Sequence, residues 1–183
     1  MTPSSHNDPI DALGAAYETM FERAAENMHT AEVKTGSVLH KAIDEAKDKA
    51  VELEELSKED AAKVSEWLRR DLDDAVSHLS ETGHELKDWL GFETTLLESA
   101  TLDLLLKAAD KTTVESLLMK ENVRQAFIYK TGEITSAGTL ICDQCGEILQ
   151  FYKSGKIPSC PRCHATTFRR GSPHLQQAVT QIK

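Results

Sequence analysis

The sequence predicts a mostly α-helical protein in which a long antiparallel helical hairpin or bundle precedes a small C-terminal β ribbon. Two observations support this fold class. Apolar residues recur at the helical period through the first two thirds of the 183-residue chain. All four cysteines lie within residues 142–163, in two Cys-x-x-Cys pairs. We therefore expect an acidic, all-helical, coiled-coil-like region over residues 1–122 and a zinc ribbon with a flexible C-terminal tail over residues 123–183.

Charge divides the chain at the same place. Residues 1–122 carry 27 acidic and 13 basic side chains, whereas residues 123–183 carry 3 acidic and 8 basic ones. No run approaches the roughly 20 apolar residues that cross a bilayer, and residues 1–9 lack the basic start and apolar core of a secretion signal. We therefore expect a cytoplasmic protein with no membrane partner, in which disulfides are disfavoured.

The first helical pattern starts at Pro9, which suits a first helical turn because its missing N–H costs nothing there. Gly36 is the weak point, where the helix kinks or breaks, since Gly in a helix interior costs about 1 kcal/mol relative to Ala. The stripe that we expect to be buried consists of Leu13, Tyr17, Met20, Ala24, Met28, Ala31, Val38, Leu39, Ala42, Ala46, Ala50 and Leu53.

The second helical pattern starts at Ser57, a hydroxyl N-cap three residues before the carboxylate of Asp60. Its apolar stripe runs to Leu90 and ends at Gly91, and two further helices are expected over 96–108 and 112–121. On its polar side we expect mostly solvated residues, namely Arg69, Arg70, Asp71, Asp73 and Asp74. Because such stripes cannot be buried alone, we expect the first two helices to pair antiparallel, within the chain or across a homodimer.

From residue 123 onward, turn residues become frequent and apolar residues alternate in short runs, which is typical of strands. The runs cover residues 126–130, 139–141, 147–152 and 166–169. Five of the ten aromatic residues lie in this part, namely Phe127, Tyr129, Phe151, Tyr152 and Phe168. We expect these rings to form the core of a small sheet; the alternative is that exposed ones stack on nucleic-acid bases.

The cysteine spacing predicts one metal site. Cys142 and Cys145 form one short loop, Cys160 and Cys163 form a second, and 14 residues separate the loops. Paired spacing of this kind lets four thiolates surround one ion tetrahedrally at about 2.3 Å, with no position left for water or substrate. We expect a structural zinc ion, and a rubredoxin-like iron site is the alternative. His164 is expected to lie outside the ligand set.

A helical bundle ahead of a four-thiolate site also raises the alternative of a di-iron enzyme built on Glu-x-x-His pairs. Two such pairs are present, Glu26 with His29 and Glu81 with His84. At about 100° per residue, both pairs point away from the apolar stripes, whereas a di-iron centre must face the bundle core. Since no other catalytic motif is present, we predict that the protein is not an enzyme.

The segment from Tyr129 to Gly146, together with Cys160-Pro-Arg-Cys163 and Phe168-Arg-Arg170, resembles the YbeL-like family of bacterial zinc-ribbon-containing proteins. The resemblance extends upstream to residues 56–60 and 67–72, so that it covers most of the chain. It implies an acidic helical region followed by a zinc ribbon, and it implies no particular activity. At His164 this sequence departs from zinc knuckles that commonly have Gly at that position.

We expect a protein-interaction module in which the ribbon is the docking element for a protein partner. The acidic helices disfavour nucleic acid, and a closed metal site presents the surface of the ribbon in one geometry. The alternative is a nucleic-acid-binding ribbon, associated with transcription or the ribosome. In either case the expected contact residues are exposed cations, namely Lys153, Lys156, Arg162, Arg169 and Arg170.

Overall fold

The computed structural model describes residues 9–30, 36–82 and 128–171. Within these residues, three helices precede a small antiparallel sheet region. The helices are α1 (Pro9–Thr30), α2 (Gly36–Glu52) and α3 (Lys58–Thr82). The predicted helices over 96–108 and 112–121, and the boundary at residue 122, lie outside the described residues. The more detailed description as a hairpin or coiled-coil-like bundle therefore stays a prediction.

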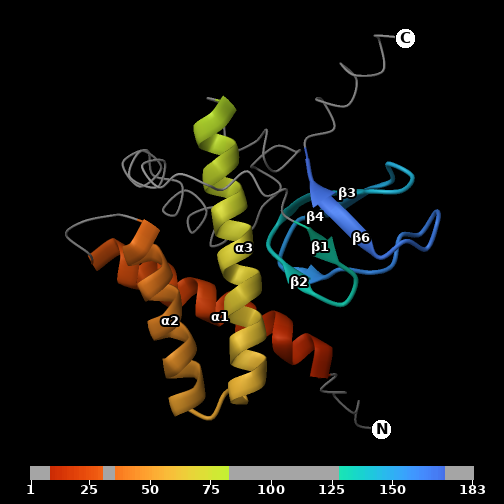
Figure 1. The fold of residues 1–183 in the computed structure, drawn as a ribbon. Helices are drawn as coiled ribbons and strands as arrows, with labels where there is room; N and C mark the ends of the chain where they lie inside the picture. Colours follow the sequence, from red (N-terminus) through yellow and green to blue (C-terminus); the bar gives the residue numbers. More distant parts are fainter. Residues whose placement is uncertain (1–8, 31–35, 83–127, 172–183) are drawn as a thin grey trace, which may run out of the picture.

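The first predicted helix is divided in two at the expected weak point, because α1 ends at Thr30 and α2 begins at Gly36. In Figure 1, α1 crosses behind α2 and α3, and α3 lies between α2 and the sheet. Most described residues of the predicted stripe are buried, but Leu53 is 49% exposed, and Leu13 and Val38 are only partly buried. Phe21 and Ile43, which the predicted stripe did not include, are also buried, and the side chains of Met28 and Ala31 lie outside what the structure describes. The helical core contains Tyr17, Met20, Phe21, Ala24, Leu39, Ala42, Ile43, Ala46, Ala50, Val64, Leu68, Leu72 and Ala75.

The turn between α2 and α3 stops one helix and starts the next. Glu54 has a left-handed φ of 55°. The N–H of Glu55 donates to Ala50 O at 3.0 Å, and the N–H of Glu54 donates to Val51 O at 3.1 Å, which is the Schellman pattern with Glu in place of the usual Gly. Ser57 then accepts the Asp60 N–H on its Oγ at 3.1 Å, so that the predicted N-cap is confirmed.

Six short strands follow the helices within residues 128–171. They are β1 (Tyr129–Lys130), β2 (Ile134–Thr135), β3 (Gly138–Cys142), β4 (Ile148–Phe151), β5 (Gly155–Lys156) and β6 (Thr167–Arg170). A four-stranded sheet has the order β1-β6-β3-β4, and β2 pairs with β5. The two-residue strands β2 and β5 fall outside the predicted runs, whereas β1, which also has two residues, lies at the end of the predicted run 126–130.

The buried apolar residues form two cores, one in the ribbon and one in the helices. The ribbon has its own small core of Tyr129, Leu140, Cys142, Ile157, Cys160, Ala165 and Phe168. Ile134 on β2 and Ala137 instead belong to the helical core, and β2 contacts α1 and α3. The ribbon is therefore seated on the helices by apolar contact as well as by the polar contacts described below.

Candidate metal centre

The first loop of the site, residues 142–147, lies at the end of β3. Cys142 donates its N–H to Glu147 O at 2.8 Å, and Gly146 donates its N–H to Cys142 O at 3.0 Å. Gly146 has a φ of 73°, a left-handed conformation that glycine adopts without steric cost. These two hydrogen bonds fold the loop so that the side chains of Cys142 and Cys145 point the same way. We call this loop the first knuckle.

The second knuckle, residues 160–165, repeats the same geometry. Cys160 donates its N–H to Ala165 O at 2.9 Å, and His164 donates its N–H to Cys160 O at 2.9 Å. His164 takes the position of Gly146 and has a φ of 60°. The departure from glycine therefore leaves the turn conformation intact, at a cost on the order of 1–2 kcal/mol for a non-glycine residue. The exposed His164 side chain lies outside the cysteine cluster.

The structure brings all four predicted ligands together. Their Sγ atoms lie within 4.8 Å of one another, with Cys142 to Cys163 at 3.6 Å and Cys145 to Cys160 at 3.5 Å. A tetrahedron with metal–sulfur bonds of about 2.3 Å has edges of about 3.8 Å, so the cluster is close to the size that one ion requires. The same distances are far longer than a disulfide bond of about 2.05 Å, and all four cysteines are free.

The surroundings of the sulfurs act on the thiols in opposite directions. A backbone hydrogen bond favours the Cys145 thiolate, but desolvation and the neighbouring cysteines outweigh it and raise the pKa of this thiol to about 12, and the pKa of Cys163 is raised as well. Desolvation opposes ionisation of Cys160, yet backbone N–H groups of Cys163 and Arg162 interact with its sulfur and lower the pKa of this thiol to about 7. Amide hydrogen bonds to sulfur of this kind orient metal-bound thiolates and stabilise their charge. Four thiolates in one cluster repel one another unless a cation lies between them, so the donor set fits a soft divalent ion.

Two aromatic rings pack in the ribbon core together with cysteines of the knuckles. Phe168 on β6 pairs with Cys142 on β3 and, across the other edge of β6, with Tyr129 on β1. Both rings are fully buried in the ribbon core, as predicted. Phe151 is half-buried, Tyr152 is 45% exposed, and Phe127 lies outside the described residues. The predicted core role therefore holds for Tyr129 and Phe168, whereas Tyr152 is not part of the core.

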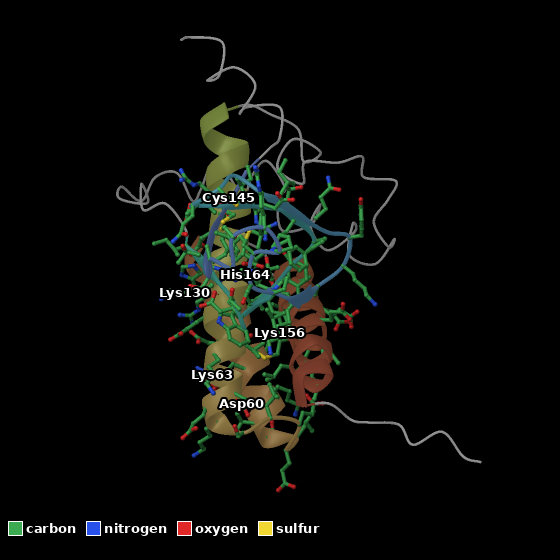
Figure 2. The ribbon with its side chains drawn as sticks, turned by 90° about the vertical axis from the view of Figure 1, so that its right-hand side faces the viewer. Asp60, Lys63, Lys130, Cys145, Lys156 and His164 are labelled. Carbon is green, nitrogen blue, oxygen red and sulfur yellow. The ribbon has the colours of Figure 1, made fainter. Side chains whose placement is uncertain are left out.

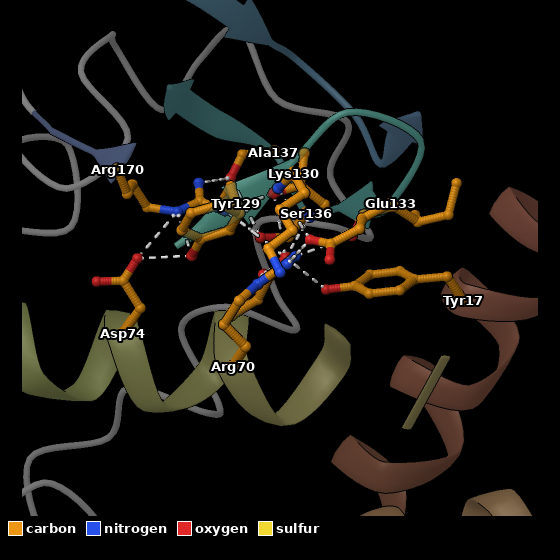
Figure 3. A network of polar contacts seen from close by, with 12 residues as sticks. Tyr17, Arg70, Asp74, Tyr129, Lys130, Glu133, Ser136, Ala137 and Arg170 are labelled. Atoms are coloured by element: carbon orange, nitrogen blue, oxygen red, sulfur yellow. Dashed lines mark hydrogen bonds and ion pairs between the residues drawn. The ribbon is translucent and has the colours of Figure 1, made fainter. Parts of the chain in front are cut away.

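The side of the ribbon next to the helices carries a buried polar network (Figure 3). Asp71 on α3 is 1% exposed, and it accepts hydrogen bonds from the Tyr17 hydroxyl at 2.9 Å and from the Ser136 N–H. Thr135 donates its hydroxyl to the same carboxylate at 3.2 Å. Tyr129 donates its hydroxyl to Asp74 Oδ2 at 2.6 Å. The carboxylates of Asp71 and Asp74 on α3 thus both bind residues of the ribbon.

Arg170 is the cation of this network, and the expectation that it is exposed for partner contacts is wrong. Its side chain is 2% exposed and pairs with Asp71 at 3.6 Å and Asp74 at 3.4 Å. Its guanidinium also donates to Thr135 Oγ1 and Ala137 O. Burial opposes its charge, but the neighbouring Tyr129, Asp71 and Asp74 raise the pKa of Arg170 above its ordinary value. Arg170 is therefore a fixed cation that joins the ribbon to α3.

Arg70 makes a second bridge from α3 to the ribbon. Its guanidinium pairs with Glu133, donates to Ile134 O at 3.0 Å and lies 4.0 Å from the centre of the Tyr129 ring. The expectation that Arg70, Asp71 and Asp74 are mostly solvated is thus wrong, because the ribbon covers this side of α3. Asp73 is half-buried and lies 3.0 Å from His40 on α2, while half-buried Arg69 pairs with Asp44.

Sequence reasoning missed this network, although one signal for it was present. At about 100° per residue, Asp71 falls within the same arc of α3 as Val64, Leu68 and Ala75. A carboxylate in an apolar arc requires a buried partner, because an unpaired buried charge is costly. Asp71 has two cationic partners: the neighbouring Arg70, which pairs with it at 3.0 Å, and Arg170 at 3.6 Å. Arg170 lies 99 residues further along the sequence, and no local pattern predicts that contact.

The other predicted contact residues lie on the surface. Lys153, Lys156 and Arg162 are exposed, and Arg169 is exposed while its Nε lies 2.7 Å from Asp143. Figure 2 shows Lys130, Lys156 and His164 on the ribbon, which lies in front of the helices in that view. Lys130 also donates its backbone N–H to Glu133 of the network in Figure 3. Arg170, unlike the exposed cations, faces the helices.

The residues of the di-iron alternative do not form a site in the described part of the chain. Glu26 is exposed on α1, as its angular position predicts, and the side chains of His29, Glu81 and His84 lie outside what the structure describes. None of the described helices is long and apolar enough to cross a membrane.

Comparisons with known proteins agree with the geometry of the site. The chain is 25% identical over 128 residues to the "Uncharacterized protein YbeL" of Escherichia coli K12, which covers 70% of this chain and 79% of the relative. The proteins of the same name from strains O6:H1 and O157:H7 match to the same extent. No solved structure matches significantly. The model of the family described as "Zinc-ribbon containing domain" matches residues 26–172. The predicted resemblance is confirmed, and the chain belongs to this zinc-ribbon family.

Proposed function

We propose that this is a non-enzymatic zinc-binding protein that acts as a protein-interaction module, with the ribbon as its docking element. The proposal starts from the metal site, because four thiolates occupy every position of a tetrahedral ion. Such a site has no open position for water or substrate, and zinc ions held in this way are structural. Zinc rather than iron is favoured by the family, and an iron-loaded ribbon is the alternative that a visible absorption band identifies.

The observation that carries the docking role is the exposed edge of the sheet. Among the described strands, β4 is an edge of the four-stranded sheet. Ile148 at its start is 40% exposed, and Tyr152 just after its end is 45% exposed. Edge strands offer backbone hydrogen bonds to an added strand, and alternate side chains then set its specificity.

Charge indicates the kind of partner. Lys153 directly follows Tyr152, and Lys156 lies on β5 a few residues later, so exposed cations stand beside the apolar side chains. An extended acidic segment of another protein fits this edge better than a basic one. Association of the helices into a homodimer and the cytoplasmic location both stay predictions.

Nucleic-acid binding is the second candidate, and exposed Tyr152 beside Lys153 favours it. An exposed ring next to a cation can stack on a base while the cation binds a phosphate. Two observations argue against it. Arg170, one of the predicted contacts, is buried against α3, and Arg169 is paired with Asp143. The excess of acidic residues over the first 122 residues also repels phosphate.

A pull-down with the tagged full chain separates these roles. We would compare the wild type with an Ile148→Thr/Tyr152→Ser variant. The control is Leu53→Thr, which removes an apolar side chain that is 49% exposed at the α2–α3 turn. The proposal predicts a defined protein that survives nuclease treatment, is lost with the double variant and is retained by Leu53→Thr.

Other outcomes of the same experiment contradict the proposal. Recovery of nucleic acid, with capture that falls steeply as salt rises, supports the nucleic-acid role instead. Capture that is the same for all three proteins shows that the β4 edge is not the docking element.

A further inference from the structure

Tyr129 belongs to the metal-site core and to the contact with the helices at the same time. Its ring packs in the cluster that includes Cys142, Cys160 and Phe168. Its hydroxyl donates to Asp74 on α3, and the Arg170 Nε donates to that same hydroxyl at 3.1 Å. A shift of this ring therefore changes both the packing below the sulfurs and the polar contact with α3.

Strand β6 also connects the core around the metal site with α3. Phe168 lies opposite Cys142 in the sheet, and Arg170 lies opposite Leu140 two residues later, which places both on one face of the strand. Phe168 is buried near the metal ligands, whereas Arg170 reaches the carboxylates of Asp71 and Asp74. The position of the guanidinium thus depends on the strand that the knuckles hold in place.

Gly138 shows how closely the ribbon must be folded for this contact. A Cβ atom placed on Gly138 would lie 1.8 Å from the Arg170 guanidinium, and the φ of 145° is one that other residues rarely adopt. Arg170 therefore lies directly against the β3 backbone, and only a formed β3–β6 pair directs it toward α3.

The described ribbon has only 44 residues, from Ile128 to Gly171, and its core contains two of the cysteines. Ribbons of this size depend on the metal for much of their folding free energy. When the metal is removed, Tyr129, Phe168 and Arg170 lose the sheet that positions them. Asp71 and Asp74 then lose their partners on the ribbon, while Tyr17 and Arg70 of the helices still contact Asp71. Both carboxylates are better hydrated in water than beneath a disordered ribbon.

We propose that metal binding by the knuckles and docking of the ribbon on α3 are a single coupled equilibrium. With the metal bound, the ribbon covers a helical face made of Tyr17, Asp71 and Asp74. Loss of the metal uncovers this acidic face while the helices keep their own core. The device converts metal occupancy into a change of exposed helical surface, and it operates whether or not the proposed protein partner exists.

Coupling of this kind is reciprocal, which makes it measurable at the metal. If the bound metal strengthens docking by some factor, docking must strengthen metal affinity by the same factor. An Asp71→Asn/Asp74→Asn variant removes two charges on α3, neither of which is a metal ligand. Glu66→Gln is the matched control, because it removes an exposed carboxylate from the same helix.

Zinc affinity is measured in the full chain by competition with a chromophoric chelator. We expect the double variant to bind zinc about 5- to 150-fold more weakly, which is the usual range for coupled sites, and Glu66→Gln to match the wild type. Equal affinity for all three proteins overturns the proposal. If the double variant does not fold, Tyr17→Phe removes one hydrogen bond to Asp71 without changing packing, and it should weaken zinc binding by a smaller factor.

Carboxylate footprinting of the wild type measures the reverse effect, which is the effect of the metal on docking. A carbodiimide with an amine label should leave Asp71 and Asp74 unmodified in the zinc-loaded chain and label both after zinc is removed, while Glu66 is labelled in both states. The far-UV helical signal should persist. Continued protection of Asp71 in verified metal-free protein overturns the proposal, as does loss of the helical signal together with the metal.

Discussion

Replacing Asp71 with Ala tests the contact between ribbon and helices most sharply. The carboxylate is 1% exposed and receives hydrogen bonds from Tyr17, Thr135 and the Ser136 N–H, in addition to its ion pair with Arg170. Arg70 pairs with the same carboxylate at 3.0 Å. Removal leaves the three donors without this acceptor and takes one carboxylate from each guanidinium, so that Arg170 keeps Asp74 and Arg70 keeps Glu133. Breaking one side of a buried ion pair costs about 3–5 kcal/mol, so we expect about 4 kcal/mol here.

A loss of about 4 kcal/mol lowers the folded-to-unfolded ratio about 1000-fold, which is a large share of the roughly 5–15 kcal/mol by which domains are stable. Urea unfolding of the zinc-saturated protein, followed by far-UV circular dichroism and by the fluorescence of half-buried Trp67, measures the free energy of unfolding. Glu66→Ala, at an exposed site on the same helix, should stay within about 0.5 kcal/mol of the wild type.

A double-mutant cycle separates the pair from its surroundings. Arg170→Met removes the guanidinium but keeps much of the apolar stem, so the variant that carries both changes has no charge left at either position. Asp74 and Arg70 each lose one partner in this variant and keep Tyr129 and Glu133, respectively. The double variant should be destabilised by about 1–3 kcal/mol less than the sum of the single variants. If Asp71→Ala costs less than 1 kcal/mol and the two changes are additive, the reasoning about a buried network is refuted.

Further predictions concern the turn, the tyrosines and the metal. Glu54→Gly should raise the free energy of unfolding by about 0.5–1 kcal/mol in urea titrations, because Glu54 has a φ of 55° at a position where glycine is unstrained; destabilisation would contradict it. Ser57→Ala should lower it by about 1 kcal/mol through loss of the N-cap bond, and an unchanged midpoint would argue against the cap. Burial, aided by nearby carboxylates, raises the pKa of Tyr17 and of Tyr129 well above the ordinary value, so both stay protonated in the folded chain while their unfolded forms ionise. Their contribution to stability is therefore complete below about pH 10 and falls above it by about 2.7 kcal/mol per pH unit, and Tyr17→Phe should halve that slope. Cys142→Ser should abolish stoichiometric zinc binding and leave most far-UV helical signal, since the helical core contains no cysteine; a collapse of helicity would show that the helices depend on the ribbon.

The sequence was sufficient for the elements whose signals are local. Ser57 as an N-cap, the break near Gly36 and the four thiolates each follow from a few neighbouring residues, and the structure places them as expected. The three longer strands, β3, β4 and β6, also fall on predicted alternating runs, because four or five residues suffice to show a period of two.

The relation between the ribbon and the helices could not be predicted in the same way. Charges on a helix are usually solvated, and the sequence offered Asp71 and Asp74 as members of an acidic surface. Their burial depends on Arg170 and Tyr129, which come from the far end of the chain, and on the close approach that Gly138 allows. Contacts between residues this far apart follow from the fold as a whole and leave no local pattern.

The metal content of the protein purified from its native host shows whether the four cysteines hold one structural zinc ion. Elemental analysis should find one zinc ion per chain in a colourless preparation, and a thiol reagent should find all four cysteines unreactive until a chelator removes that ion. An iron-loaded chain with a visible absorption band would show that the native metal is iron. Protein without stoichiometric metal, whose four thiols react freely in the folded state, would contradict the account.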